Sequence, residues 1–382
     1  MRDDITQKLA AIFSFIQADA ESNIGEYLDK YLDRRIRNAG KIKHREDSMT
    51  TRRSLLFLAG IGSLGAVIGS RTPTRADPAS QKVNVVIPAE SVFVLNYMGG
   101  KDAGIFAKHG IDLEVDARPF AGFLAGLPSK QCMAVTYSGI DSIQKINEGL
   151  DWAIIGPGLT VVQDVIVLKD SPYKTVADLR GKIFGTFSTG AGSFKAARAA
   201  MIDAFNLDVV KDARLQQVAG PALKILLERG QVDAMINISS LSMSAEAQQD
   251  KFRVLFSPND YWRQKTGYPI VWAAPIVAWK SWIDEDKTRA KNFVDATVDS
   301  FKWLAKPENL ETAVKNHGKF AGVTTPADIA EYKLWLGKKQ MFLTSWDRKT
   351  VDAQWKFLDV CQKTGIISAV PDEDKYALFV GS

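Results

Sequence analysis

Residues 183–193 read IFGTFSTGAGS and combine a short apolar strand with the start of a helix. Residues 183–187 have the length and apolar character of a buried strand. The glycines of 188–193 allow a tight turn, and the next residues, near 193–205, have a helical pattern. A strand that passes directly into a helix is the repeating unit of α/β folds.

The same alternation of strand and helix extends in both directions from this stretch. Upstream, we predict strands at 82–87, 111–115, 133–137, 152–156 and 164–168, before Asp170-Ser171-Pro172 breaks the pattern. Downstream, strands are predicted at 214–218, 234–238 and 252–256, with a late strand at 276–279 and helices to the end. We therefore expect largely parallel sheets covered by helices on both faces.

Two strand series separated by a breaker predict two α/β lobes, the second inserted into the first. We expect lobe 1 to comprise residues 81–170 plus 263–382, with the C-terminal helices, and lobe 2 to comprise residues 171–262. The chain would cross between the lobes near 168–172 and 258–275. A chain of 382 residues is long enough for two such cores.

The N-terminal part has the pattern of an export signal. Arg52 and Arg53 precede an apolar, glycine-rich stretch at 58–69, and small residues with Arg71 and Arg75 follow. Paired arginines before a short apolar segment are typical of a twin-arginine signal peptide, which we place at 49–76. Residues 1–48 form an N-terminal extension: either Met49 is the true start, which we favour, or the signal has a long charged region.

Composition excludes several classes of protein. Most of the formal net charge of +5 lies in the four arginines of 49–76, so the remaining chain is nearly neutral and does not suggest nucleic-acid binding. Cys132 and Cys361 are far apart, and the three histidines form no metal-binding motif. We expect no metal site and no cofactor. The two cysteines either pair after export or remain as small core residues.

Three motifs carry a family resemblance. Residues 104–115 read GIFAKHGIDLEV, residues 169–172 and 177–182 read KDSP and ADLRGK, and residues 226–234 read LLERGQVDA. Together, in this order behind an export signal, they resemble the sulfonate-, nitrate- and thiamine-precursor-binding proteins of the NMT1/THI5-like family, with similarity over about 83–305. The resemblance implies a type II periplasmic binding protein fold, in which two α/β lobes joined by a hinge close on a solute.

The chain departs from the family pattern at two places. Residues 127–133 read LPSKQCM where relatives often carry LxxGxxD, and residues 237–241 read NISSL where many relatives carry a Trp-Glu-Pro sequence. The second departure lies near the expected cleft. The identity of the ligand is therefore not transferred from the family.

Candidate ligand-binding residues lie where strands end and helices begin, because loops and helix N-termini converge at the carboxyl edge of an α/β sheet. The free N–H groups and dipole of a helix start favour an anion. The resemblance also implies a ligand-contacting loop after the first strand. The candidates are Ser91, Phe93, Tyr137, Ser138, Gly139, Ser188, Thr189, Gly190, Ser193, Asn237 and Ser239.

The resemblance implies a periplasmic, monomeric binding protein that delivers a small, anionic organic solute to an ABC permease in the inner membrane. Sulfonates, nitrate, carboxylates and pyrimidines are the classes we expect for this small-molecule ligand. Two alternatives remain: an exported enzyme on the same fold, similar to the thiamine-pyrimidine synthases, and a ligand sensor for a membrane receptor. The synthases carry a cysteine-rich motif that this chain lacks.

Overall fold

The computed structural model describes residues 80–381. The predicted extension at 1–48 and the predicted signal peptide at 49–76 lie outside the described residues. Among the helices of residues 80–381, none is long and apolar enough to cross a membrane. Cys132 and Cys361 are both free and buried, and burial raises the pKa of the Cys132 thiol to about 11.

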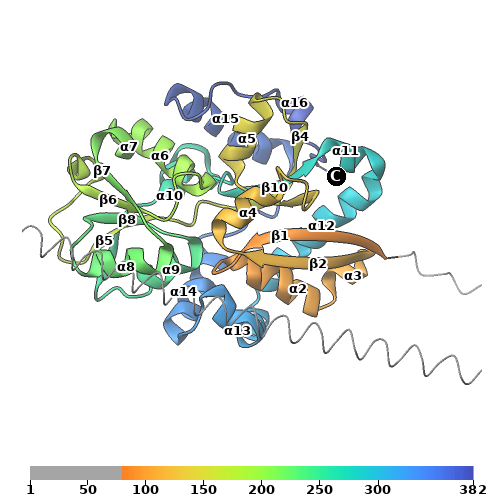
Figure 1. Ribbon diagram of the computed structural model, residues 1–382, viewed down its shortest axis with the longest axis horizontal. Coiled ribbons are helices and arrows are strands. Elements are labelled where there is room, and N and C mark those ends of the chain that lie inside the picture. Colours follow the sequence, from red (N-terminus) through yellow and green to blue (C-terminus); the bar gives the residue numbers. More distant parts are fainter. Residues whose placement is uncertain (1–79, 382) are drawn as a thin grey trace, which may run out of the picture. The chain divides into compact units, whose positions relative to one another are not determined.

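One lobe carries two small sheets (Figure 1). Strands β1 (Gln81–Pro88) and β2 (Ile111–Arg118) pair in parallel over their whole length. The second sheet has the order β3-β10-β4, with β3 (Ala134–Thr136) and β4 (Trp152–Leu159) both antiparallel to β10 (Ala274–Trp279). We refer to this part, together with the helices packed on it, as lobe 1.

The other lobe is built on a five-stranded sheet with the order β7-β6-β8-β5-β9. Its strands are β5 (Val165–Leu168), β6 (Ile183–Thr186), β7 (Arg214–Gln217), β8 (Ala234–Ile236) and β9 (Phe252–Phe256). Strand β6 is parallel to β7 and β8, whereas β5 is antiparallel to β8 and β9. We refer to this part as lobe 2.

The chain passes between the lobes twice. It leaves lobe 1 after β4 and enters lobe 2 at β5, and it returns from β9 to β10. One crossing therefore lies at 160–164 and the other at 257–273. Hydrogen bonds join them: the N–H of Val161 donates to the carbonyl of Ile270 over 2.9 Å, and the Asn259 amide donates to the Thr160 hydroxyl over 3.1 Å.

Two expectations differ from this topology. The prediction of largely parallel sheets is wrong, because four of the seven strand pairs within residues 80–381 are antiparallel. An outgoing and a returning crossing run in opposite directions, and this antiparallel ribbon continues into both lobes as β4–β10 and β5–β9. The first crossing lies before 165–168 rather than at 168–172, so this strand belongs to the sheet of lobe 2 and not to lobe 1.

Helices cover the sheets and form the C-terminal part. On lobe 1 these are the π-helical turn η1 (Val94–Met98), α2 (Gly99–Asp102), α3 (Ile105–Lys108), α4 (Phe120–Gly126) and α5 (Gly139–Asn147). On lobe 2 they are η2 (Val176–Leu179), α6 (Gly192–Phe205), α7 (Val209–Asp212), α8 (Gly220–Glu228) and α9 (Ser239–Glu246), and α10 (Pro258–Thr266) lies within the second crossing. The C-terminal helices are α11 (Lys280–Glu285), α12 (Lys287–Leu304), α13 (Pro307–Ala321), α14 (Pro326–Leu336), α15 (Arg348–Lys363) and α16 (Glu373–Tyr376).

Local sequence explains several helix boundaries. Helix α14 begins with a capping box in which Thr325 and Asp328 satisfy each other's backbone N–H groups, and Pro326 occupies the first turn. The side chain of Asp286 caps α12 and separates it from α11. Gly104 has a φ of 70°, a left-handed conformation that separates α2 from α3.

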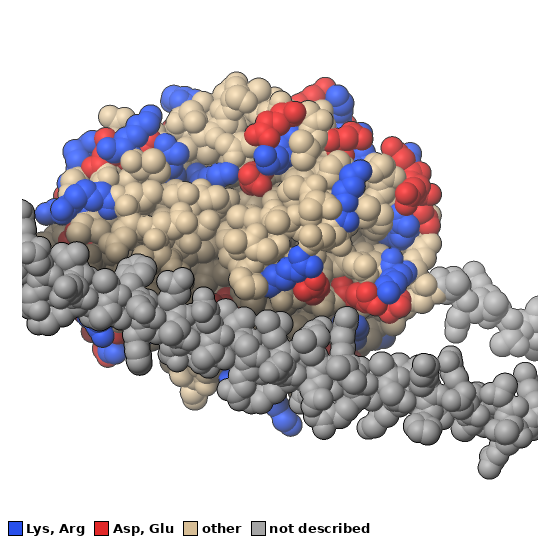
Figure 2. Space-filling model, in the orientation of Figure 1, with Lys and Arg blue, Asp and Glu red and all other residues tan. Residues whose placement is uncertain are grey.

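Apolar side chains form one large core that runs through both lobes, and a second, smaller core lies in lobe 2. The smaller core contains Leu223 and Leu227 of α8 against Met235 of β8. Figure 2 shows lysine and arginine mixed with aspartate and glutamate on one face of the molecule, with a broad uncharged area between them. This distribution agrees with the nearly neutral charge of residues 77–382.

Candidate functional site

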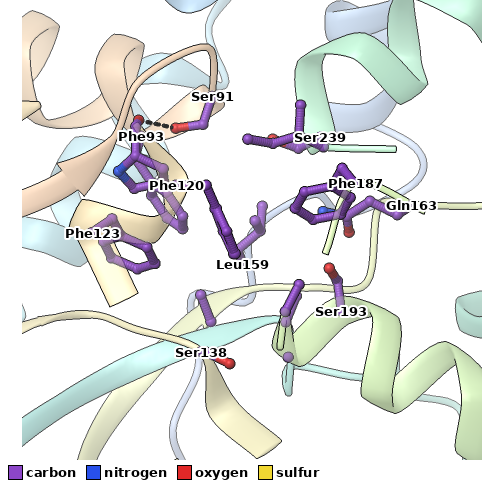
Figure 3. A pocket seen from close by; sticks show the side chains of 16 residues that line it. Ser91, Phe93, Phe120, Phe123, Ser138, Leu159, Gln163, Phe187, Ser193 and Ser239 are labelled. Atoms are coloured by element: carbon purple, nitrogen blue, oxygen red, sulfur yellow. Dashed lines mark hydrogen bonds between the residues drawn. The ribbon is translucent and has the colours of Figure 1, made fainter. Parts of the chain in front are cut away.

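A small cavity lies between the lobes (Figure 3). Its lining comes from the loop after β1, helix α4, the end of β4, both crossings, and the loops before α5, α6 and α9. The cavity volume is about 30 Å³, enough for roughly one or two water molecules. The lobes are therefore in the closed arrangement around it.

Serine residues at four helix starts converge on this cavity. Ser91 precedes η1, Ser138 is the N-cap of α5, Ser193 lies in the first turn of α6, and Ser239 is the first residue of α9. No side chain caps α5, α6 or α9. The first N–H of α5, on Gly139, donates to the Ala273 carbonyl over 3.4 Å, whereas the first N–H groups of α6 and α9 remain available for a ligand. In Figure 3 the Ser193 hydroxyl, on the helix of lobe 2, points into the cavity. The arrangement supplies serine hydroxyls and helix N-termini from both lobes, although the Ser91 hydroxyl already donates to the Pro88 carbonyl over 2.7 Å.

Two buried polar atoms of the lining have no partner in the structure. The Ser138 hydroxyl, in a side chain of which 3 % is exposed, makes no hydrogen bond, and neither does the Oε1 atom of Gln163. An unpaired buried polar group costs about 1–3 kcal/mol. Such a cost at two positions of one cavity is typical of groups that await a ligand or water.

Glycine is required where the lobes meet. A Cβ atom on Gly192 would lie 2.8 Å from both the Ser138 hydroxyl and the Trp272 carbonyl oxygen. A Cβ atom on Gly139 would lie 2.7 Å from the same carbonyl. Any larger residue would push the starts of α5 and α6 away from the segment at 272–275. These glycines allow the two helix starts to approach each other.

The rest of the cavity wall is apolar and rich in phenylalanine. The rings of Phe120 and Phe187, from opposite lobes, meet edge to face with centroids 5.1 Å apart. Phe123 packs beside Phe120, and Phe93 lies on the same side of the cavity (Figure 3). The remaining apolar lining comes from Pro88, Leu159, Ala191, Ile238, Ala273 and Ala274. All five polar side chains of the lining are uncharged: four serines and one glutamine.

Polar contacts also join the lobes beside the cavity. Lys195 of α6 donates to Gln144 of α5 over 2.6 Å and lies 3.4 Å from the Asp141 carboxylate. On another side, the Ser240 hydroxyl of α9 donates to the carbonyl of Glu90. Glu90 has a φ of 53°, which is unusual for a residue with a side chain. Together with the Phe120–Phe187 contact, these bonds hold the cleft closed.

Five of the eleven sequence candidates line the cavity: Ser91, Phe93, Ser138, Ser193 and Ser239. Gly139 lies behind Ser138, at the contact with 272–275. The Tyr137 hydroxyl instead donates to the Leu124 carbonyl over 2.6 Å, and burial raises its pKa. Asn237 is fully buried and donates to the Gly220 carbonyl over 2.9 Å.

The turn after β6 differs most from expectation. Thr189 is exposed, and its backbone N–H and hydroxyl both bond to the Gln217 side chain over 3.0 and 3.1 Å. The Ser188 hydroxyl accepts the N–H of Gly190 over 3.2 Å. None of these three residues is part of the cavity lining. From this stretch the cavity is lined by Phe187 and by 191–193.

Several lining residues were not among the candidates, namely Phe120, Phe123, Leu159, Gln163 and Phe187. Phe120 follows Pro119 at the end of β2, the kind of strand-to-helix position that the prediction used elsewhere. Phe187 ends the predicted strand at 183–187. Sequence offered no comparable signal for Gln163, because its crossing was placed elsewhere.

Comparison with known proteins identifies the family. The family model described as NMT1/THI5 like matches residues 94–309, which is more than half of the chain. No curated protein sequence matches.

Solved structures show the same fold at low identity. The periplasmic aliphatic sulphonate binding protein SsuA from Escherichia coli superposes with a TM-score of 0.61 and 16% identity, covering 80% of this chain and 94% of its own. A protein from Bordetella bronchiseptica RB50 gives a TM-score of 0.61, 18% identity and coverage of 78% and 95%. The alkanesulfonate-binding protein SsuA from Xanthomonas axonopodis pv. citri, bound to MOPS, superposes with a TM-score of 0.58 and 14% identity, covering 78% of this chain and 96% of its own. The fold is that of the type II periplasmic binding proteins, and the chain belongs to the NMT1/THI5-like family.

Proposed function

We propose that the protein is the periplasmic solute-binding component of an ABC importer and captures a small organic anion by closing its two lobes. One observation carries the proposal: four serine-bearing helix starts, from both lobes, converge on one cavity without charged side chains. Each helix start stabilises a nearby anion by about 0.3–1 kcal/mol, and by up to roughly 2 where it is partly buried.

The lining favours an organic anion over an inorganic one. Serine hydroxyls and free N–H groups can bind the oxygens of a sulfonate or carboxylate. The phenylalanines and Leu159 provide apolar surface that only an organic substituent would contact. We therefore propose a sulfonate or carboxylate with a compact apolar group. That SsuA proteins with the same fold bind sulfonates supports this choice.

Closure follows from the placement of the hydroxyls. Ser138 belongs to lobe 1 and Ser193 to lobe 2, so a ligand between them contacts both lobes only when the cleft is closed. Such a ligand shifts the population toward the closed form, which the permease would recognise. A ligand bound to one lobe alone would produce no shift. The export signal predicted from the sequence would bring the protein to the periplasm.

Binding is better supported than catalysis. Nucleophilic or acid–base catalysis uses a serine or cysteine beside a histidine, carboxylate or lysine. The cavity lining contains serines but no titratable side chain beside them. The lining chemistry therefore supports recognition of a solute.

A thermal-shift screen of the full chain tests the proposal. Alkanesulfonates, small aromatic sulfonates and carboxylates are compared with nitrate, choline and glucose at equal concentrations. At about 100 times the Kd, the organic anions are expected to raise Tm by roughly 3–6 °C. Small-angle scattering should show a smaller radius of gyration with the ligand that gives the largest shift.

Matched variants connect the shift to the cavity. Ser193→Ala removes a hydroxyl that points into the cavity, so the shift should decrease. Ser188→Ala changes a serine of the same loop outside the lining, so the shift should persist. Stabilisation by choline or glucose alone would contradict the proposed ligand class, and an unchanged radius of gyration at saturation would contradict closure.

A further inference from the structure

The cavity has one side on which its wall reaches solvent. Of the 16 side chains that line it, only Phe120 and Phe187 are half-buried, and the other fourteen are buried. Because these two rings are in edge-to-face contact, they cover the cavity where the two lobes meet. They are the wall residues that a solute from the solvent would meet first.

The two rings move with different lobes. Phe120 is the first residue of α4 on lobe 1, and Phe187 directly follows β6 on lobe 2. Phe120 is supported by Phe123, whose ring lies 5.7 Å away, and Phe123 packs in turn on Tyr137 at 5.4 Å. Phe187 lies on the loop that leads into α6. Opening of the cleft must therefore separate the rings, and closing must bring them together.

We propose that Phe120 and Phe187 form an aromatic gate that controls access to the cavity and sets the largest apolar group a ligand can carry. The size limit rests on the proposed function, whereas the access role is a property of the cleft itself. With the rings in contact, the cavity volume of about 30 Å³ leaves room for only a few heavy atoms. A bulky substituent would hold the rings apart and so prevent closure.

The chain provides a matched control for this pair. Phe205 and Phe256 also meet edge to face, with centroids 5.3 Å apart, and both are half-buried. Both belong to lobe 2, at the end of α6 and the end of β9. Truncation of Phe205 removes the same chemical contact without affecting the meeting of the lobes.

The first experiment needs no ligand. Ser193→Cys places a thiol on the cavity wall, and the rate at which methyl methanethiosulfonate labels it is measured in the full chain. The chain without this substitution gives the labelling of the native Cys132 and Cys361, which is subtracted. If the gate is open for roughly a tenth of the time, Phe187→Ala or Phe120→Ala should speed labelling about tenfold. Phe205→Ala should leave the rate unchanged. Phe187→Leu, which keeps an apolar side chain, tests the same point with less risk to folding.

The second experiment measures the size limit by calorimetry with alkanesulfonates of increasing chain length. In Phe187→Ala, the ratio of the affinity for longer alkanesulfonates to that for methanesulfonate should be about ten times the ratio in the unchanged protein. One methylene in a fitted pocket changes discrimination by roughly 10–200-fold. Phe205→Ala should retain the original profile. Phe120→Ala should change the profile in the same direction as Phe187→Ala.

The outcomes separate the gate from the proposed function. Equal labelling rates in the gate variants and the Phe205 variant would overturn the gate. Faster labelling with an unchanged size profile would overturn the size limit. Faster labelling in a protein that binds no organic anion would support the gate and contradict the proposed function.

Discussion

The cavity and a neighbouring buried cluster differ in charge: the cavity wall has no charged side chain, and the cluster consists of charged residues. The cavity wall includes Gln163, and all of its polar side chains are uncharged. The next residue, Asp164, belongs to a buried acid cluster that we define as Asp164, Glu246, Glu331 and Lys339. Lys339 pairs with Glu246 and Glu331, and the charge of Asp164 acts on both Lys339 and Glu246, next to a cavity that is lined by no charged side chain. Charge is concentrated in the framework and kept out of the place where a solute must be bound and released.

The buried acid cluster joins the first crossing, α9 and the end of α14. Lys339 lies 3.1 Å from Glu246 and 3.6 Å from Glu331, and the Trp335 indole also donates to Glu246 over 3.1 Å. Burial raises the pKa of Glu246 to about 7, despite the opposing effect of Lys339. Burial likewise raises the pKa of Asp164 and of Glu331. For Lys339, burial opposes the charge, but the surrounding carboxylates outweigh it and raise the pKa.

The largest expected decrease in the free energy of unfolding comes from replacing Lys339, which carries the amine of the cluster. Lys339→Met leaves Glu246 and Glu331 without their cation, and loss of one partner of a buried ion pair costs about 3–5 kcal/mol. Because the Lys339 side chain is 29% exposed, the lower end of that range applies. Urea unfolding at pH 7.5 measures the free energy of unfolding.

Lys333→Met is the matched control on α14. Lys333 lies 2.6 Å from Glu311, but these side chains are 38% and 60% exposed. Its loss should cost less than about 1 kcal/mol. Equal losses in the two variants would show that the cluster is no more important than a surface ion pair.

The next effect is a dependence of stability on pH. Glu246 keeps its proton up to about pH 7 in the folded protein but loses it near its usual value of 4.5 when unfolded. The folded state therefore binds more protons at Glu246 between these values, so the contribution of this group to stability is fully present below pH 4.5 and is lost as the pH rises to 7. We expect a fall of roughly 1–3 kcal/mol. The charged or polar groups facing Glu246 and the nearby Asp164 are Glu331, Trp335, Lys339, Ser257 and Asp260.

Glu246→Gln tests the sign as well as the size of this dependence. Glutamine can still accept the Trp335 N–H, but it does not titrate, so the fall in unfolding free energy between pH 4.5 and 7 should shrink. The exposed variant Glu311→Gln serves as the control and should keep the slope of the unchanged protein. An equal change of unfolding free energy over this interval in Glu246→Gln and in the unchanged protein would contradict the assignment.

Part of the candidate site could be predicted from local sequence patterns, whereas other residues depend on contacts between distant segments of the chain. Ser138, Ser193 and Ser239 were candidates because a strand end followed by a helix start is a local pattern, and position in an α/β sheet then fixes where it lies. The two-lobe fold followed from the alternation of strands and helices together with the family resemblance. These inferences need no knowledge of how the lobes pack.

The residues that were missed depend on contacts between distant parts of the chain. Phe120 and Phe187 line the cavity only because the lobes meet there, and β3, β4, the first crossing and β5 lie between the two positions in the chain. The acid cluster combines Asp164 with Lys339, from opposite halves of the chain. Thr189 was expected at the ligand, but the turn bonds its hydroxyl to Gln217 instead. Side-chain direction in a turn is decided by such tertiary partners.

The smallest effect on stability is expected inside the cavity, where the change should appear in binding. The Ser138 hydroxyl is buried without a partner, so Ser138→Ala removes an unsatisfied group and should change the unfolding free energy of the ligand-free protein by less than about 1 kcal/mol, in either direction. For an organic anion the same hydroxyl would donate to a charged oxygen, so its loss should weaken binding by about tenfold or more. Calorimetry and urea unfolding measure the two quantities on the same samples. Thr189→Ala, an exposed hydroxyl outside the lining, should leave affinity within about twofold. If Ser138→Ala instead destabilised the protein strongly and left affinity unchanged, the hydroxyl would be part of the framework, and the contrast between a charged framework and a neutral binding cavity would lose its main support.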